Sequence, residues 1–334
     1  MVSMKDIAAR CGVSVATVSK ALNNHSDIGE DTKKNICEIA QAMGYFPNSS
    51  ARALKTKRTD NLGVLFVDEG RSGLTHEYFS KVLDSFKRYA EDLGYDITFI
   101  NAQSHNMTYL EHSKYRGVDG VVIACVDFSE PEVINLINSD LPVVTIDHVF
   151  DSRISVVSDN IGGMRELVQY IYEKGHTKIA YIHGDDTAVT KNRLASFYNT
   201  LSNLGVEVPE EYAMGSAYRN PELAAERTKK ILKLRNRPTC IIYPDDYSAI
   251  GGITAIKEAG LSVPEDISVV GYDGIYVSQI INPKLTTYEQ NTEEIGKIAA
   301  RSLIKLIKDS KSTLIEKITV SGRIISGESV ADLR

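Results

Sequence analysis

The chain has 334 residues, 43% of them hydrophobic and 25% charged, which is ordinary for a globular protein and allows two or three domains. No apolar run approaches the roughly 18 residues that span a membrane, and no charged start precedes an apolar core as in a secretion signal, so we expect a cytoplasmic protein. The formal net charge of −6 is uneven, because residues 1–58 hold nine basic and five acidic side chains; a small basic head on an acidic body suits a module that binds nucleic acid.

The first stretch with a clear local pattern is residues 4–23. Its first part places Ile7, Ala8 and Cys11 on one face of a helix, and Gly12 is a stop signal because glycine enters the left-handed region without steric cost. A second helix follows, with a buried stripe (Val18, Ala21, Leu22) and an outward face (Val15, Ala16, Thr17, Ser19, Lys20). Two short helices joined by a tight turn predict a helix-turn-helix, although the same pattern fits two helices of a small bundle.

The remainder of the head is short. A third helix is predicted from Asp31 to about Met43, which makes a marginal three-helix core. After a turn, residues 48–57 contain a capping residue and good helix formers, but they are too few to form a stable helix alone. They are therefore either a short helix that needs a partner or a plain basic linker.

From Asn61 onward, short apolar runs alternate with helical patterns. The first half predicts strands at 62–67, 96–101, 120–125 and 142–146, with helices at about 76–93, 107–116 and 131–138. The second half predicts strands at 179–183, 239–243, 267–271 and 315–320, with helices at about 160–174, 191–204, 221–234, 247–259 and 292–307. This alternation predicts two doubly wound lobes, each a parallel sheet with helices on both faces. The pattern resembles periplasmic sugar-binding proteins, in which the ligand lies between the lobes at the carboxyl ends of the strands.

Five stretches contain characteristic sequence motifs. Residues 5–23 read K-D-I-A-A-R-C-G-V-S-V-A-T-V-S-K-A-L-N, and the body contains V-V-S-D-N-I-G-G (156–163), G-H-T-K-I-A (175–180), V-P-E-D-I-S-V-V-G-Y-D (263–273) and P-K-L-T-T (283–287). These stretches resemble the signatures of the LacI/GalR family of bacterial transcription regulators. The chain departs from the family pattern at Cys11, where alanine is usual, and at Lys20, where arginine is usual. The resemblance covers almost the whole chain.

The resemblance implies three parts. They are a helix-turn-helix DNA-binding domain at 1–46, a hinge helix and linker at 47–60, and an effector-binding and dimerisation domain at 61–334. In the family architecture the chain crosses between the lobes three times, and we place these crossings near Ser158, Tyr288 and Val320. The N-lobe then comprises about 61–158 and 289–320, and the C-lobe about 159–288 and 321–334. We therefore expect a small all-α head and an α/β body with two lobes of periplasmic-binding-protein type.

The outward face of the second helix supplies the candidate base contacts. Val15 and Ala16 can offer only apolar contact, for example to a thymine methyl, whereas Lys20 can donate to guanine. The polar side chains beside them are candidates for phosphate contacts: Ser14, Thr17, Ser19 and Asn23. Thr17 and Ser19 could also be merely solvated.

The resemblance adds the hinge to this interface. In the family, two hinge helices of a dimer order in the minor groove of operator DNA, and a leucine from each wedges into the central base step and kinks the duplex. Leu54 occupies that position. The hinge candidates are Asn48, Ala51, Arg52, Leu54 and Lys55.

Candidate ligand contacts stand where strands of the body end. Four charged residues align by resemblance with effector contacts of the family: Asp147, Arg193, Asp245 and Asp273. Asp245 stands where asparagine is usual in the family, which puts its role in doubt. Carboxylates facing an arginine suit the hydroxyl groups of a sugar, because ionised groups make the stronger hydrogen bonds. Three aromatic residues could stack on a sugar or simply pack in the protein: Tyr78, Phe150 and Tyr247. The polar stretch at 68–76 either shapes ligand choice or is a surface loop.

Together these features predict a homodimeric repressor on a pseudo-palindromic operator, controlled by a sugar or sugar derivative. Control of the same DNA-binding role by a protein corepressor is left open, and a sugar-binding protein without DNA binding fits the lobes but not the head. An enzyme is not expected, because neither a phosphate-binding loop motif nor a dinucleotide motif is present. The four cysteines are scattered without metal-ligand spacing, so we expect neither a metal nor a cofactor.

Overall fold

The computed structural model describes residues 2–46, 53, 57–67, 73–101 and 106–334. The chain forms two compact units, Met1–Thr59 and Asp60–Arg334, which are the head and the body. The hinge candidates Asn48, Ala51, Arg52, Leu54 and Lys55 lie outside the described residues, as do residues 68–72 of the polar stretch after the first strand.

The head is a three-helix unit built around a helix-turn-helix. Its helices are α1 (Met4–Cys11), α2 (Val15–Leu22) and α3 (Glu30–Ala42). Gly12 ends α1 with φ +67°, and the Ser14 hydroxyl begins α2 by accepting a hydrogen bond from the Thr17 amide at 3.0 Å. Ile7, Val18 and Ile36, one from each helix, are fully buried and form the small core.

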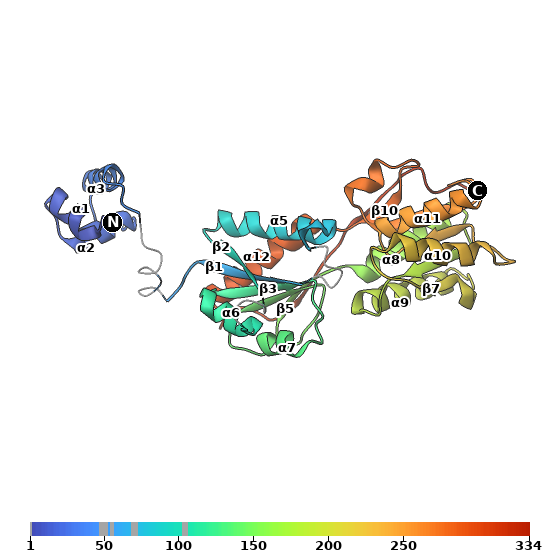
Figure 1. The fold of residues 1–334 in the computed structure, drawn as a ribbon, viewed down its shortest axis with the longest axis horizontal. Coiled ribbons are helices and arrows are strands. Elements are labelled where there is room, and N and C mark those ends of the chain that lie inside the picture. The colour runs from blue at the N-terminus through green and yellow to red at the C-terminus, as the bar shows by residue number, and fades with distance from the viewer. Residues whose placement is uncertain (1, 47–52, 54–56, 68–72, 102–105) are drawn as a thin grey trace. The chain divides into compact units, whose positions relative to one another are not determined.

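The N-lobe of the body is a six-stranded parallel sheet in the order β11-β5-β4-β3-β1-β2. Its elements are β1 (Asn61–Phe66), η1 (Gly73–Thr75), α5 (Glu77–Asp92), β2 (Asp96–Ile100), α6 (Tyr109–Arg116), β3 (Gly120–Ala124), α7 (Pro131–Ile137), β4 (Val143–Ile146), β5 (Ile154–Ser158), α12 (Thr292–Lys308) and β11 (Lys317–Val320). Helices α5 and α12 cover one face of this sheet, and α6 and α7 cover the other (Figure 1).

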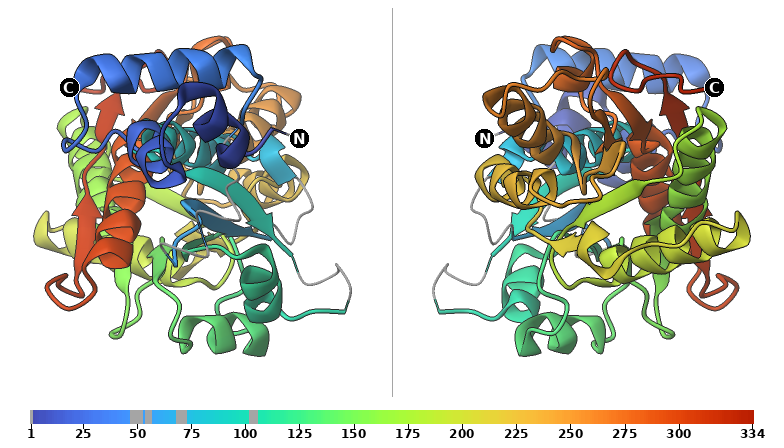
Figure 2. Two further views of the ribbon diagram at one scale, coloured as in Figure 1. Left: turned by 90° about the vertical axis from the view of Figure 1, so that its left-hand side faces the viewer. Right: turned by 90° about the vertical axis from the view of Figure 1, so that its right-hand side faces the viewer.

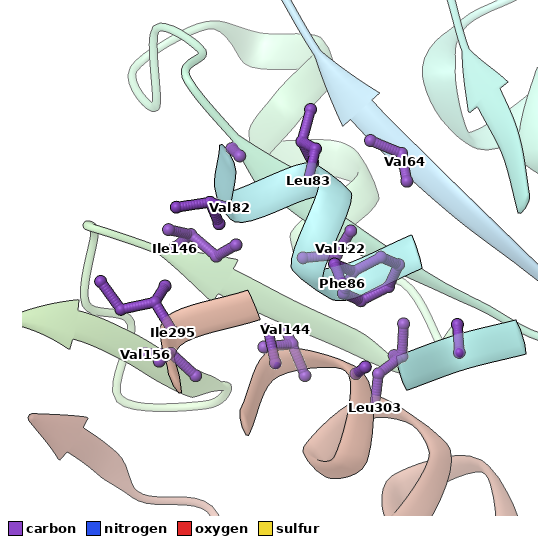
Figure 3. Packing of buried hydrophobic residues seen from close by; sticks show 14 of the residues in the cluster. Val64, Val82, Leu83, Phe86, Val122, Val144, Ile146, Val156, Ile295 and Leu303 are labelled. Atoms are coloured by element: carbon purple, nitrogen blue, oxygen red, sulfur yellow. The ribbon is translucent and has the colours of Figure 1, made fainter. Parts of the chain in front are cut away.

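The face under α5 and α12 shows why the central strands are mostly apolar. Phe86 of α5 and Leu303 of α12 point toward Val122 and Val144 on neighbouring strands (Figure 3), and all four side chains are fully buried. The other face of the same strands is buried by α6 and α7. Strands covered on both faces read as continuous hydrophobic runs, which is the pattern in the sequence.

The C-lobe repeats this architecture with the strand order β12-β10-β9-β8-β6-β7, in which β12 is the one antiparallel strand of the described sheet. Its elements are α8 (Asn160–Glu173), β6 (Ile179–His183), α9 (Ala188–Asn203), η2 (Glu210–Tyr212), β7 (Ala213–Gly215), α10 (Pro221–Leu232), β8 (Cys240–Ile242), α11 (Asp246–Glu258), β9 (Ser268–Asp273), η3 (Tyr276–Gln279), β10 (Thr286–Glu289) and β12 (Arg323–Ile325). Figure 2, right, shows the gold α10 and orange α11 on one side of the sheet, and the lime-to-yellow α8 and α9 on the other.

The two doubly wound lobes confirm the expected fold. The chain passes from one sheet to the other after β5, after β10 and after β11. Four short strands had no assignment from the sequence: β5, β7, β10 and β12. In the described ranges no helix has the length and apolar character needed to cross a membrane.

A buried histidine ties the C-terminal segment to the C-lobe. His176 is 1% exposed; its Nε2 donates to the Ala331 carbonyl at 3.1 Å, and its Nδ1 lies 2.8 Å from the Thr239 hydroxyl. The Ala331 carbonyl can only accept, so the neutral ring carries its proton on Nε2 and Nδ1 accepts from Thr239. Burial lowers the pKa of His176.

Replacing His176 with alanine should lower the free energy of unfolding of the body by about 2–3 kcal/mol, because buried partners lose their hydrogen bonds. The folded state favours the neutral ring, so the stability that His176 contributes is complete above the ordinary histidine pKa of about 6.5 and declines as the pH falls below it. Urea unfolding of parent and variant at about pH 7.5 and about pH 5.5 measures both effects. An unchanged difference between the two proteins at the two pH values would contradict this assignment.

Candidate functional site

The outward face of α2 is the first candidate site. Val15 is 42% exposed, and Ala16 and Lys20 are also exposed, whereas Val18 and Ala21 on the opposite side are buried. The helix therefore presents two small apolar side chains and one cation to solvent. The Nζ atom of Lys20 lies 2.5 Å from Oδ2 of Asp27, a contact that the sequence pattern did not predict.

The four predicted phosphate contacts lie around the ends of α2. The hydroxyls of Ser14 and Thr17 are 2.8 Å apart at its N-terminus, and Asn23 donates from Nδ2 to the Ser19 carbonyl at 2.6 Å near its C-terminus. Ser19 is half-buried and Asn23 is exposed. These side chains thus shape the ends of the helix as well as lining its exposed surface.

The second candidate site lies where strands of the two lobes end. Asp147 directly follows β4 of the N-lobe, and Asp273 is the last residue of β9 in the C-lobe. Both have positive φ angles, +59° for Asp147 and +105° for Asp273. A side chain held in this sparsely populated region is a mark of functional sites, because the surrounding structure must offset the strain.

Arg193 lies in the first turns of α9 and is 3% exposed. Its Nε donates to Asn160 Oδ1 at 2.8 Å, its Nη1 donates to the Pro244 carbonyl at 2.9 Å, and the guanidinium stacks on Tyr272 at 3.6 Å from the ring centroid. One edge of the guanidinium is therefore fixed by the protein. Gly163 permits this packing, since a Cβ there would lie 2.5 Å from the Tyr272 hydroxyl.

Asp147 is held by two donors of its own lobe. The Tyr78 hydroxyl donates to Oδ2 at 2.7 Å, and the Ser158 amide donates to Oδ1 at 3.1 Å. Burial raises the pKa of Asp147, while these hydrogen bonds and the charge of Arg193 in the other lobe oppose the rise. Tyr78 thus supports Asp147 from α5, and its ring packs edge-on against Phe79.

Asp273 is held by a residue at the second crossing between the lobes. Gln290, 5% exposed, donates from Nε2 to Asp273 Oδ1 at 2.6 Å. Burial raises the pKa of Asp273 to about 7; the charge of Arg193 lowers it, and Asp245 and Asp147 raise it further. The effect of Asp147 is a repulsion between carboxylates of the two lobes.

Asp245 and its neighbour Asp246 are engaged within the C-lobe. Asp245 is 1% exposed and caps α11 by accepting from the Ser248 amide at 2.8 Å, while its other oxygen accepts from the Arg219 amide at 2.7 Å. Asp246, fully buried, accepts from the Thr287 hydroxyl at 2.6 Å and from the Ile275 amide at 2.9 Å. These carboxylates fix the loops that follow β8 and β9.

The remaining aromatic candidates lie in two places. Tyr247, at the start of α11, has the Arg219 guanidinium 5.3 Å from its ring centroid. Phe150 joins Phe128 and His148 in an aromatic cluster that follows β3 and β4. The structure therefore groups Asp147, Arg193 and Asp273 electrostatically and places these rings with other partners.

Two buried polar atoms lie at the crossings between the lobes. Oε1 of Gln290 and Oγ of Ser158 have no hydrogen-bond partner among the described residues, although both side chains are at least nine-tenths buried. Both residues also hold a carboxylate of the site: Gln290 donates to Asp273, and the Ser158 amide donates to Asp147. We call Ser158, Asp147, Arg193, Asp273 and Gln290 the interlobe site. Gln290 and Ser158 are not among the residues predicted from the sequence for this site, because a lone polar residue at a strand end has no distinctive pattern.

Two hydrogen bonds join the lobes directly. The backbone amide of Tyr276 donates to Glu77 Oε1 at 2.7 Å, and Arg219 Nη2 donates to the Thr75 carbonyl at 3.4 Å. Among the described residues, no group of three or more histidine, cysteine or acidic side chains is placed to hold a metal ion.

Comparisons with known proteins agree with this arrangement. Residues 3–48 match the model of bacterial regulatory proteins of the lacI family, and residues 168–330 match the periplasmic binding protein-like domain. The chain is 30% identical over 337 residues to the probable HTH-type transcriptional repressor ExuR of Bacillus subtilis (strain 168), covering 100% of this chain and 99% of the relative.

Two solved structures share the fold. The lac repressor dimer bound to operator and the anti-inducer ONPF gives a TM-score of 0.82 at 23% identity, over 99% of each chain. The complex of the transcriptional regulator CelR with cellobiose gives 0.71 at 22% identity, over 98% of this chain and 100% of that chain.

A helix-turn-helix head carried by a two-lobed periplasmic-binding-protein-like body defines the class of DNA-binding transcriptional regulators. These proteins are regulators rather than enzymes. The chain belongs to the LacI family of bacterial transcriptional repressors.

Proposed function

We propose that this repressor is controlled by a small polyhydroxylated ligand, a carbohydrate or carbohydrate derivative, bound at the interlobe site. The observation that carries the proposal is a buried arginine, Arg193, anchored by Asn160 and the Pro244 carbonyl, whose charge acts on buried carboxylates of both lobes. A ligand bound there would contact both lobes and so favour one arrangement of them over another, which is the requirement for control of a distant site.

The donor and acceptor inventory supports hydroxyl groups on the ligand. Asp147, Asp273 and Oε1 of Gln290 accept hydrogen bonds, and Arg193 donates. A sugar hydroxyl both donates and accepts, so adjacent hydroxyls can satisfy such a mixed set, and hydrogen bonds to ionised groups are the stronger ones. The CelR–cellobiose complex is a carbohydrate complex of a protein with the same fold.

A thermal-shift screen of the full chain against free sugars, sugar acids and sugar phosphates tests the ligand class. A ligand at about one hundred times its Kd stabilises a protein by about 2.7 kcal/mol, which corresponds to a rise in Tm of several degrees. At least one member of the panel should produce this rise. A protein that binds its operator but responds to no member would contradict the carbohydrate proposal and favour a protein corepressor.

We also propose that the repressor binds a pseudo-palindromic operator as a homodimer, on chromosomal DNA in the cytoplasm. Val15, Ala16 and Lys20 would contact base edges, and Ser14, Thr17, Ser19 and Asn23 the phosphates. The hinge residues Asn48, Ala51, Arg52, Leu54 and Lys55 would lie in the minor groove at the centre of the operator. The lac repressor, which has the same fold, binds its operator as a dimer, and this supports the proposed arrangement.

Replacing Leu54 with alanine should weaken operator binding at least tenfold while changing binding to an unrelated duplex by less than about twofold, because an apolar wedge acts only where the DNA is kinked. Fluorescence anisotropy with both duplexes measures the two losses. Leu333→Ala, at an exposed C-terminal position, is the matched control and should change neither. Equal losses on the two duplexes would show that Leu54 is not a wedge.

A further inference from the structure

The recognition helix carries an ion pair that its role in reading DNA does not explain. Lys20 is the one charged residue of α2, and its Nζ lies 2.5 Å from Oδ2 of Asp27, with the two side chains 50% and 55% exposed. A carboxylate on the surface that faces DNA is unfavourable, since DNA carries one negative charge per about 1.7 Å of its axis.

The position of Asp27 is set by the fold on both sides. The chain turns back after α2 through Asn24, which has φ +56°, and the His25 amide donates to the Lys20 carbonyl at 3.0 Å. On the other side, Ile28 packs against the buried core of the head. The backbone on both sides of Asp27 is therefore fixed, and this holds the carboxylate near Lys20.

The pairing changes what Lys20 can gain from DNA. A free lysine is attracted by every phosphate, and this attraction supplies nearly all of non-specific binding. The pair of Lys20 and Asp27 has no net charge, so the general field of the backbone attracts it little. It keeps two N–H donors of Lys20, which suit guanine O6 and N7, and free lone pairs on Asp27, which suit the N4 amino group of cytosine.

We propose that Asp27 is a specificity-determining residue that positions Lys20 as a reader of a G·C pair and keeps it from acting as a general phosphate contact. To contact a phosphate, Lys20 must leave Asp27, and the carboxylate then stands unpaired beside the polyanion. To contact a base edge, the pair need not separate. The proposal rests on the DNA-binding role of the family and does not depend on the identity of the effector.

The test measures the Kd of the full-length repressor for two duplexes from about 50 to about 200 mM salt. One duplex is the operator selected from a random pool with the parent protein, and the other is a scrambled duplex of the same composition. Asp27→Asn removes the charge and keeps the shape. Glu30→Gln is the matched control, because it makes the same charge change in the head but pairs with Lys33 at 3.2 Å instead of Lys20.

Asp27→Asn should strengthen binding to the scrambled duplex about fivefold or more and lower the ratio of specific to non-specific affinity by a similar factor. The plot of log K against log salt should steepen by about 1 for each head, because a newly free lysine displaces one more counterion. Lys20→Met alone should weaken operator binding about tenfold and leave the scrambled duplex nearly unchanged. In Lys20→Met/Asp27→Asn the effects of Asp27→Asn should disappear.

Three results would overturn the proposal. One is an equal change in scrambled-duplex affinity in Asp27→Asn and Glu30→Gln, which would show that the change comes from net charge alone. Another is a loss of scrambled-duplex binding in Lys20→Met as large as its loss of operator binding. The third is a persistent Asp27→Asn effect in the absence of Lys20.

Discussion

Replacing Arg193 with methionine is expected to abolish the response to the effector, with a loss in ligand affinity of at least a hundredfold. The charge of Arg193 acts on carboxylates from both lobes, Asp147 and Asp273, and a buried charged hydrogen bond to a ligand is worth about 2–5 kcal/mol when truncated. The change also leaves Asn160 and the Pro244 carbonyl without their donor. We therefore expect a further cost of about 2–4 kcal/mol in the stability of the body.

Isothermal titration with a ligand identified in the screen measures the first effect, and urea unfolding measures the second. Arg153→Met is the matched control. Arg153 donates to the Ile137 and Ser139 carbonyls just before β5, at the edge of the N-lobe sheet opposite Asp147, so this variant should lose stability but keep its ligand affinity. Normal ligand binding by Arg193→Met would show that Arg193 does not contact the ligand.

Replacing Asp273 with asparagine is expected to remove most of the pH dependence of effector binding. The pKa of Asp273 is about 7 in the ligand-free protein, chiefly through burial, so the carboxyl is largely protonated at about pH 5.5 and ionised at about pH 8. Ligand hydroxyls donate better to the ionised form, so the affinity of the parent protein should rise tenfold or more over this range. The variant should match the parent approximately at the lower pH and fall short of it at the higher pH.

The raised pKa of Asp273 also affects the stability of the ligand-free protein. The pKa of Asp273 is higher in the folded protein than the ordinary aspartate value, so its contribution to stability is complete below about pH 4 and is lost as the pH rises through about 7. Asp273→Asn should therefore be more stable than the parent at about pH 8 when no ligand is present. Arg193, Asp245, Asp147 and Gln290 also act on Asp273, so the pH dependence of the difference between parent and variant is the quantity to measure. An unchanged pH dependence of ligand binding in the variant would assign the titration to another group.

The secondary structure of this chain could be predicted where burial requires a continuous run of apolar residues in the sequence. Strands such as β3 and β4 are covered by helices on both faces; β3 is apolar at every position, and β4 departs from this only at Thr145. The strands that were missed are short or lie at the crossings: β7 has three residues, and β5 and β10 lead directly into the other lobe. Their strand character depends on a neighbour that is distant in sequence, which a local pattern cannot contain.

The candidate sites were predictable to the extent that topology fixes them. Parallel strands place their carboxyl ends at one edge of a sheet, so Asp147 and Asp273 could be expected at the edges that face a ligand. The partners that hold them could not be predicted, since Gln290 lies 17 residues beyond Asp273 and Ser158 lies 11 beyond Asp147. The contact between Lys20 and Asp27 was missed because it crosses the end of a helix, where neither helical spacing nor a motif applies.

The most direct test of the account is operator binding by the parent and by Arg193→Met, with and without a ligand found by the screen. Fluorescence anisotropy of a labelled operator duplex gives the Kd in each of the four conditions. We expect a saturating ligand to change the operator affinity of the parent by at least about fivefold, the lower end of ordinary allosteric coupling, and that of the variant not at all. A ligand that binds the parent tightly at the interlobe site but leaves its operator affinity unchanged would contradict the account.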